Sequence, residues 1–478
     1  MDLSGIEQAS GLSRGDLGEL RALLDVHAAH AARNRELEDF YDGKRPPCDI
    51  GIEVVPPGVD PGVRCDWARK AVTSVSERVR MDGFAFDGEY EDEGLAACAR
   101  RSRLVSEFNR HVASELVHGC MFATVNRDDG GRAYVRLHSA STSAAIWDSY
   151  HGRIGSGLVV ADARRTEWSP TAPVPVLVNM HLPGAVVVLR RASSSEWSSE
   201  RREFDLDRPM MEAFTYRATG TRPFGETRIT PAVRYLVDEV NRTLRYMAVS
   251  SAFYARPQKY VLGLNDEQFD AMMADKWQTY IGSVLLGTVN EETGSAPTVG
   301  QLASASPQPY IDALQAYGKL FSGATGVPLN SLGIVQDNPS SAEAITAQRE
   351  DVCTAAEDCI ESNRESMCEV ALLAMAVEAD ASPDDLTDEQ RSVVPKFSDP
   401  QRTSRAARGD YAVKVAGAAP EYPSTSQFWR DLGYGEQETS EILRSIRYAQ
   451  AQSAMAAAVS QEQPVLVTEA AGIEGAMG

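Results

Sequence analysis

The sequence lacks the cysteine spacing of a metalloprotein or of a disulfide-bonded secreted protein. Its seven cysteines are scattered along the chain, and no two of them are spaced as CxxC. They are Cys48, Cys65, Cys98, Cys120, Cys353, Cys359 and Cys368. An odd, scattered set argues against a disulfide framework and against a zinc site. We therefore expect reduced and mostly buried thiols, as in a soluble protein that stays inside a cell.

Short catalytic motifs are missing as well. The chain contains no GxxxxGK[ST], GxSxG or HExxH stretch and no EF-hand loop, so the commonest nucleotide, hydrolase and metal signatures are absent. His27 with His30, and His111 with His118, are spaced for one helix face, but no third ligand follows at metal spacing. The sequence predicts no catalytic residue, no metal and no cofactor. A carboxylate-dependent hydrolase is the enzymatic alternative that stays open.

Basic residues and long apolar runs are also scarce. The chain has 47 Lys and Arg against 68 Asp and Glu, a formal net charge of −21. Classical nucleic-acid binders depend on cationic side chains that neutralise phosphates, so this balance argues against tight DNA binding. The longest apolar run, "ALLAMAV", is too short to cross a bilayer, and the first residues lack a signal-peptide pattern. We expect no membrane association.

The first half of the chain reads as an α+β region that ends near residue 228. Helical periodicity covers residues 16–41, 66–79 and 94–118. Alternating or apolar runs then follow, in the order "CMFATV", "AYVRLH", "SAAIWD", "GLVVAD", "VPVLVNM" and "AVVVLRR". The turn signal "NRDDGG" between the first two runs predicts a β-hairpin. With 478 residues, 43% of them hydrophobic, the chain has the length of two to four domains.

A second pattern begins at residue 230. Thr230 as N-cap and Pro231 at the first helical position predict a helix over residues 230–253. The run "PQKYVLGL" predicts a strand, and a second helix follows over residues 307–322, ended by Gly323 and Gly326. One helix therefore leads out to a small module and another helix returns from it.

The stretch "NPSSAEAITAQREDV" opens a long predicted helix. Ser340 and Glu343 form a capping box, and neither proline nor glycine interrupts the chain from residue 341 to residue 379, which is 39 residues or about 58 Å of helix. Its apolar stripe is Ile345, Val352, Ala356, Cys359, Met367, Val370, Ala374 and Val377. Nine acids lie off this stripe, Glu343, Glu350, Asp351, Glu357, Asp358, Glu361, Glu365, Glu369 and Glu378, against Arg349 and Arg364. This pattern is typical of a solvated acidic face, a coiled coil or a rod that lines a channel.

Prolines end this helix after residue 381. Two further helices are expected over residues 401–416 and 436–458, followed by a loose tail from residue 461.

Four motifs, in this order and at these separations, carry a resemblance. They are "TRPFGETRITPAVRYLVDEVNRT", "ARPQKYVLG", "TGVPLNSLG" and "NPSSAEAI". Together they resemble the portal proteins of tailed bacteriophages, of the type common in long-tailed phages, over roughly residues 20–450. The resemblance implies a ring of usually twelve copies at one vertex of the phage head, through which double-stranded DNA enters and leaves.

The resemblance also implies a domain plan. Residues 1–229 correspond to N-terminal helices and an α/β wing, 230–253 and 307–325 to paired stem helices, and 254–306 to the clip between them. Residues 326–340 correspond to the tunnel loop, 341–380 to a long tunnel and crown helix, and 381–460 to a wing return and a small helical crown. Residues 461–478 form the flexible tail. The long helix is then explained because it crosses the ring body.

Three groups of site residues follow from this plan. The tunnel loop contributes Asn330, Ser331, Gln336, Asp337 and Asn338 to the DNA channel. Glu357, Glu361 and Glu365 are the expected channel-lining acids. Asn290, Glu291, Glu292 and Thr293 are expected to dock a partner at the clip.

The implied partners are further copies of the chain, the terminase large subunit, the head–tail adaptor, the major capsid or scaffold protein, and DNA in transit that is bound weakly. The implied location is the virion, with the host cytoplasm during assembly. Another structural or scaffolding protein of a phage is the non-enzymatic alternative.

Overall fold

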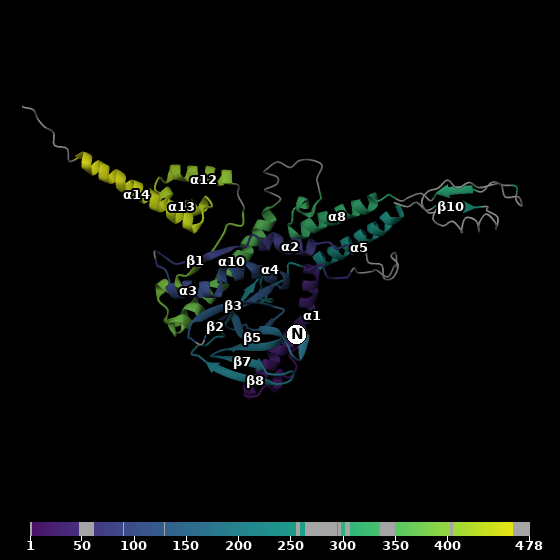
Figure 1. The fold of residues 1–478 in the computed structure, drawn as a ribbon, viewed down its shortest axis with the longest axis horizontal. Coiled ribbons are helices and arrows are strands. Elements are labelled where there is room, and N and C mark those ends of the chain that lie inside the picture. Colours follow the sequence, from purple (N-terminus) through teal and green to yellow (C-terminus); the bar gives the residue numbers. More distant parts are fainter. Residues whose placement is uncertain are drawn as a thin grey trace, which may run out of the picture. The chain divides into compact units, whose positions relative to one another are not determined.

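The computed structural model describes residues 2–46, 62–88, 90–128, 130–254, 259–262, 294, 298–301, 306–334, 349–401 and 405–461. The chain divides into two compact units, Met1–Pro400 and Gln401–Gly478. The first unit mixes helices and sheets, so the predicted α+β class is confirmed (Figure 1). Among the described residues, no helix combines the length and apolar character that crossing a bilayer requires.

The N-terminal helices begin at residues that cap them. The helices are α1 (Arg14–Tyr41), α2 (Trp67–Ser76), α3 (Glu93–Ser102) and α4 (Leu104–His118). Ser13 starts α1, because its side chain accepts a hydrogen bond from the Asp16 backbone amide at 3.1 Å. The single helix predicted over residues 94–118 is wrong, since Arg103 adopts a left-handed conformation with φ of 52° and separates α3 from α4. The apolar period continues across this break because both helices bury residues in one core.

Two antiparallel sheets follow the helices. The three-stranded sheet has the order β3-β2-β9, with β2 (Cys120–Arg127), β3 (Ala133–Ser139) and β9 (Met211–Thr215). The five-stranded sheet runs β4-β5-β6-β7-β8, with β4 (Ser143–Asp148), β5 (Arg153–Thr166), β6 (Ser169–Leu182), β7 (Ala185–Arg191) and β8 (Trp197–Glu203). The six predicted runs all lie in strands, and the hairpin at "NRDDGG" is confirmed by the pairing of Arg127 with Ala133. The polar strand β8 and the short strand β9 escaped prediction.

Alternation along β2 gives each face of the three-stranded sheet its own partner. Met121 and Ala123 face α4 and α10, while Phe122 faces the five-stranded sheet. The far side of the five-stranded sheet is covered by α1 and by the short helix η1 (Ile6–Gln8), through residues such as Leu20 and Leu158. The first unit is therefore layered from helices through two sheets to α1.

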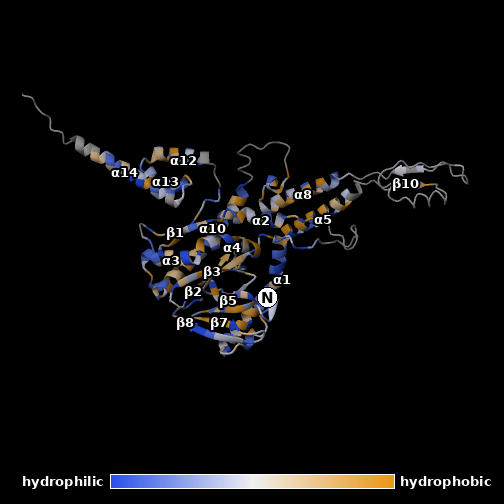
Figure 2. Ribbon diagram, viewed as in Figure 1, coloured by the Kyte–Doolittle hydropathy of each residue, from blue (hydrophilic) through white to orange (hydrophobic). Residues whose placement is uncertain are grey.

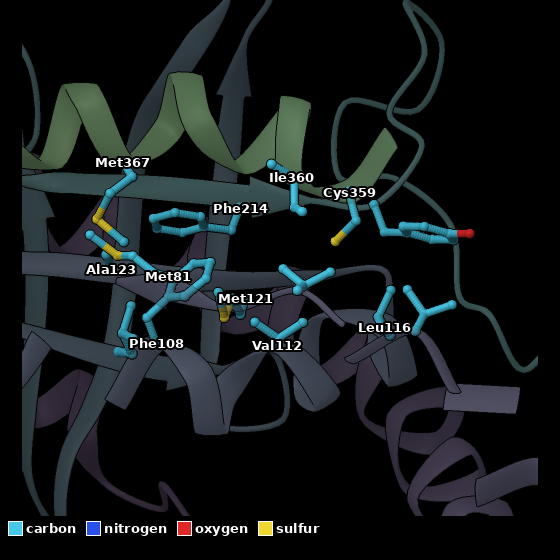
Figure 3. Packing of buried hydrophobic residues seen from close by; sticks show 14 of the residues in the cluster. Met81, Phe108, Val112, Leu116, Met121, Ala123, Phe214, Cys359, Ile360 and Met367 are labelled. Atoms are coloured by element: carbon cyan, nitrogen blue, oxygen red, sulfur yellow. The ribbon is translucent and has the colours of Figure 1, made fainter. Parts of the chain in front are cut away.

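The central core lies between α4 and α10 (Glu350–Ala379). Figure 3 shows Phe214 of β9 between Phe108 of α4 and Met367 of α10, and the Phe108 and Phe214 ring centroids are 5.6 Å apart. Of the six cysteines in described residues, five are buried and Cys368 is half-buried, and all six are free thiols. The predicted reduced and mostly buried state is confirmed for these six.

The described part of the predicted long helix is α10. α10 begins at Glu350 and has 30 residues, and residues 341–348 of the expected 39-residue helix lie outside the described residues. Its N-cap residue Arg349 makes no side-chain capping bond. The predicted capping box of Ser340 and Glu343 lies outside the described residues.

Two helices that follow the sheets pack side by side (Figure 1). They are α5 (Pro231–Tyr254) and α8 (Gln308–Thr325), and a two-stranded antiparallel sheet pairs β10 (Lys259–Leu262) with β11 (Thr298–Gln301). The predicted cap of α5 is confirmed, since Thr230 Oγ1 accepts from the Val233 amide at 3.3 Å. α8 passes through Gly323 and ends at Gly326, whose φ is 71°. Apolar and polar residues alternate along both helices (Figure 2).

The remaining elements of the first unit follow α8 and α10, and the last of them pairs with the first strand. They are η2 (Leu329–Leu332), η3 (Pro383–Asp385), α11 (Asp388–Arg391) and β12 (Val394–Phe397). β12 pairs antiparallel with β1 (Met81–Ala85), more than 300 residues earlier in the chain. No local signal predicted this pair, because both strands are short and each depends on the other for its hydrogen bonds.

The second unit is a small helical body. It contains α12 (Arg405–Ala418), η4 (Tyr422–Ser424), α13 (Ser426–Asp431) and α14 (Glu436–Gln461). Its aromatic residues pack edge to face, with ring centroids 5.2 Å apart for Phe428 and Trp429 and 5.7 Å apart for Trp429 and Tyr434. Both helices predicted here are present, at slightly shifted bounds, and α13 was not predicted. The predicted loose tail lies outside the described residues beyond residue 461.

Candidate functional site

The three expected channel acids share one exposed strip of α10. Glu357, Glu361 and Glu365 recur every four residues and are all exposed, as their spacing on a helix predicts. Glu361 has a basic neighbour in its own helix, with 3.6 Å between Arg364 Nε and Glu361 Oε2. We call Glu357, Glu361 and Glu365 the acidic strip. Its exposed carboxylates form a negatively charged surface on α10, and this charge repels phosphate groups.

Asp358, next to the acidic strip, approaches a basic residue from outside α10. Arg217, which follows β9, places Nη2 4.0 Å from Asp358 Oδ2, and both side chains are about half exposed. This distant pair is weak in water. Asp358 therefore adds to the negative charge beside the acidic strip.

The acids in the C-terminal half of α10 have a different role. Glu369 forms an ion pair with Arg208 at 2.6 Å, and Glu378 forms one with Arg101 of α3. Arg208 also lies 3.5 Å from Glu212 of β9, whose pKa is raised to about 7 by burial. These carboxylates hold α10 to the body of the first unit. The Glu369 side chain is still 44% exposed, whereas that of Glu378 is only 19% exposed.

A buried polar contact lies under the acidic strip. Glu115 of α4 is completely buried and accepts hydrogen bonds from Asn363 Nδ2 at 2.9 Å and from Cys359 Sγ at 3.6 Å. Burial raises the pKa of Glu115 to about 7. Sequence reasoning missed this contact, although Asn363 stands in phase with the apolar residues Cys359 and Met367, where a polar residue signals a buried partner.

A second buried polar residue joins three elements at the base of α8. The Arg228 guanidinium donates to the Ala71 carbonyl at 2.6 Å, to the Tyr216 hydroxyl at 2.9 Å and to the Thr325 carbonyl at 2.6 Å. Arg228 lies in the motif "TRPFGETRITPAVRYLVDEVNRT", where the sequence alone offers no reason for it. In the structure it fixes the last turn of α8 to α2 and to the chain after β9.

The expected tunnel-loop residues are only partly described. Asn330 and Ser331 lie exposed on η2, the turn that follows α8. Gln336, Asp337 and Asn338 lie outside the described residues. The expected clip residues Asn290, Glu291, Glu292 and Thr293 also lie outside the described residues.

The paired helices have a partly polar contact surface. Glu239 and Arg242 of α5 form an ion pair, and Tyr317 of α8 lies close enough to Glu239 for that carboxylate to contribute to the raised pKa of the phenol, after burial. The Cys65 backbone amide donates to Asn241 Oδ1 at 2.7 Å, which ties the chain before α2 to α5. Tyr235 and Leu320 remain largely exposed on the outside of the pair.

The histidine pairs do not converge on a metal site. His27 Nε2 lies 3.3 Å from the Ser141 carbonyl, and His118 Nε2 lies 3.5 Å from Glu38 Oε1. His111 is hydrogen bonded within its own helix to the Glu107 carbonyl. Across the described residues, no group of three or more metal-ligating side chains is present.

A cavity of about 540 Å³ lies between the two sheets and the C-terminal end of α10. It is lined by several acids, as a carboxylate-dependent hydrolase would require. Asp128, Glu203 and Asp380, however, each pair with an arginine, at 2.8, 3.3 and 2.7 Å. These three carboxylates are engaged in ion pairs, and this arrangement does not favour the hydrolase alternative.

Comparisons with known proteins cover most of the chain. No protein-family model matches it. The portal protein of Mycobacterium phage D29 is 24% identical over 420 residues, which span 86% of this chain and 84% of the relative. The portal protein of Mycobacterium phage L5 is 24% identical over 419 residues, 85% of this chain and 83% of the relative.

Among solved structures, a chain from the neck of an empty GTA particle matches 88% of this chain and 98% of its own length, with a TM-score of 0.45 and 13% identity. A chain from the neck of a native GTA particle matches 77% of this chain and 90% of its own length, with a TM-score of 0.42 and 13% identity. The sequence motifs and the two phage relatives agree with each other. The resemblance of this chain to the portal proteins of tailed bacteriophages is thereby confirmed over most of its length.

Proposed function

We propose that this chain is the portal subunit of a tailed-phage particle, which assembles into a ring and conducts double-stranded DNA into and out of the head. The observation that carries the proposal is the match to two phage portal proteins over more than four-fifths of their length. A match over 420 residues is far longer than any single shared motif. The role is that of a structural conduit.

The domain plan is part of the proposal. The helices and sheets of residues 1–229 form the wing, α5 and α8 form the stem, and residues 254–306 form the clip. Residues 326–340 form the tunnel loop, and α10 carries the chain from the tunnel toward the crown at residues 381–460. This plan is supported by the side-by-side packing of α5 and α8 and by the antiparallel pairing of β10 with β11, which lie between them in the sequence.

The acidic strip suits a conduit. DNA that must move needs a lining that binds it weakly, and exposed Glu357, Glu361 and Glu365 oppose the phosphates without releasing their counterions. We propose that the acidic strip and the exposed Asn330 and Ser331 face the DNA channel. Copies in a ring multiply this charge around the bore.

The partners follow from the same role. We propose that the clip, through Asn290, Glu291, Glu292 and Thr293, docks the terminase large subunit during packaging and the head–tail adaptor afterwards. The wing would contact the major capsid or scaffold protein. The protein would then be a virion component that assembles in the host cytoplasm.

The oligomeric state of the purified chain tests the proposal. A closed ring of twelve copies of the 51.9 kDa chain has a mass of about 623 kDa. Native mass spectrometry and particle images should show closed rings, and rings of eleven to fourteen copies would agree equally well. Only monomers or dimers at low salt would contradict a portal, and they would favour another structural or scaffolding protein.

A further inference from the structure

A glycine in the middle of α8 receives a side chain from the turn that follows the helix. A Cβ atom at Gly318 would lie 2.1 Å from Ile334 Cδ1 and 3.5 Å from Trp67 Cη2. Gly318 is buried. Beside it, Trp67 of α2 packs against Phe321 of α8, with their ring centroids 5.1 Å apart. Gly318 is thus a notch, bordered by Trp67, that holds the end of the Ile334 side chain.

The turn that carries Ile334 is internally bonded. The Ile334 amide donates to the Leu329 carbonyl at 3.3 Å, and the Gly333 amide donates to the Asn330 carbonyl at 3.3 Å. Leu332 packs against the central core. Leu332 and Ile334 therefore point inward while Asn330 and Ser331 are exposed, so the inward side chains decide where the exposed residues lie.

The first turn of α10 contacts the C-terminal end of α8. Gly326 ends α8 with φ of 71°, and a Cβ atom there would lie 2.7 Å from Asp351 Cβ and 3.6 Å from the Val352 nitrogen. Any side chain at residue 326 would push the first turn of α10 away. Val327 and Val352 are both buried beside this contact.

Both ends of the chain between residues 334 and 349 are thus held on α8, at two glycines eight positions apart. Eight positions correspond to about 12 Å along the helix axis. We propose that Gly318 with Ile334, and Gly326 with Asp351, are positioning contacts that set where the tunnel loop leaves the body and where α10 takes over. The role of these contacts in DNA passage rests on the proposed function, whereas the seating of Ile334 does not.

The contact of Ile334 with the notch at Gly318, which we call the seat, is tested by hydrogen exchange of local amides in the full chain. Ile334→Ala empties the notch, and Gly318→Ala occupies the position of Ile334 Cδ1. Both should speed exchange of the Gly333 and Ile334 amides by about tenfold. Gly323→Ala is the matched control, because a Cβ atom at Gly323 of the same helix meets nothing within 4 Å. The double variant Gly318→Ala/Ile334→Val removes the clashing Cδ1. The remaining valine methyl takes the place of Ile334 Cγ1, which lies 3.6 Å from the added Cβ. Amide exchange should therefore return toward the wild-type rate.

DNA packaging in the same variants tests the positioning role. We expect Ile334→Ala and Gly318→Ala to form rings of wild-type mass that package DNA more slowly, and the control and the double variant to package normally. Unchanged exchange in Ile334→Ala would overturn the seat. Faster exchange with wild-type packaging would overturn the positioning role. If the wild-type chain forms no ring, the proposed function fails, and the exchange experiment still decides the seat.

Discussion

The side-chain amide of Asn363 donates a hydrogen bond to the buried carboxyl group of Glu115, with 2.9 Å between Nδ2 and Oε2. This contact joins α10 to α4 directly beneath the acidic strip. Because burial raises the pKa of Glu115 from 4.5 to about 7, the folded chain binds more protons than the unfolded chain between these two values. The stability that the protonated carboxyl contributes is complete below pH 4.5 and is lost as the pH rises through 7.

We predict that Glu115→Gln makes the midpoint of thermal unfolding less sensitive to pH between 5 and 8. The uncharged amide removes a pH-dependent contribution on the order of 3 kcal/mol to the free energy of unfolding. Glu212, whose pKa is raised in the same direction, leaves a smaller slope in the variant. Glu365→Gln, at an exposed position of α10, is the control and should keep the wild-type slope. Identical slopes for all three proteins would contradict the prediction.

Arg228→Ala should strongly destabilise the first unit. The substitution leaves the Ala71 and Thr325 carbonyls and the Tyr216 hydroxyl without their cationic donor, which costs on the order of 3 to 5 kcal/mol. Urea unfolding monitored by tryptophan fluorescence measures the change. Arg222→Ala, in the same sequence motif but largely exposed and 3.5 Å from Glu226, should cost less than about 1 kcal/mol. An equal loss of unfolding free energy in the two variants would show that the three buried hydrogen bonds of Arg228 do not stabilise the fold.

Lysine at Glu357, Glu361 and Glu365 should turn the chain into a DNA binder. If the acidic strip faces the channel, a ring of twelve would exchange 36 negative charges for 36 positive ones, and the triple variant should bind DNA with an affinity that falls steeply with salt. Packaging should stall while rings still form, because none of the three side chains is buried. Fluorescence anisotropy with a DNA duplex over a series of salt concentrations measures the binding.

The control for this variant changes the same number of charges elsewhere. Glu167, Glu196 and Glu200 are exposed on and beside β8 and the β5–β6 turn, and lysine at these positions should affect packaging far less. Wild-type packaging together with absence of DNA binding in the Glu357, Glu361 and Glu365 variant would place the acidic strip away from the channel.

Alanine at Asn290, Glu291, Glu292 and Thr293 should abolish partner docking and leave rings intact. Substitution is preferable to deletion of residues 290–305, because Thr298–Gln301 form β11 and pair with β10. A pull-down with the terminase large subunit or with the adaptor measures docking. As a control, alanine at Ser306 and Gln308, at the start of α8, should leave docking unchanged. Retained binding in the fourfold variant would assign docking to another surface.

Much of the fold could be predicted because its signals are local. Ser13 and Thr230 cap α1 and α5, and Gly326 ends α8, so backbone chemistry within a few residues decides these boundaries. The six predicted strand runs are apolar or alternate, and each one is a strand in the structure. The break at Arg103 escaped prediction since the Ser102 hydroxyl there accepts from the Val135 amide of a distant strand, at 2.8 Å. That hydrogen bond exists only after the helices have packed on the sheet.

The candidate site divides in the same way. The four-residue spacing of Glu357, Glu361 and Glu365 by itself determined that they share one helix face, because every α-helix repeats with that period. Only the tertiary structure decided that Glu369 and Glu378 form ion pairs with Arg208 and Arg101, whose positions come from other segments of the chain. The sequence also determined the resemblance to phage portal proteins, through short motifs in a fixed order. The notch at Gly318, the buried Arg228 and the buried Glu115 required the folded chain, since each depends on atoms that the sequence separates by at least a dozen residues and that only packing brings within contact.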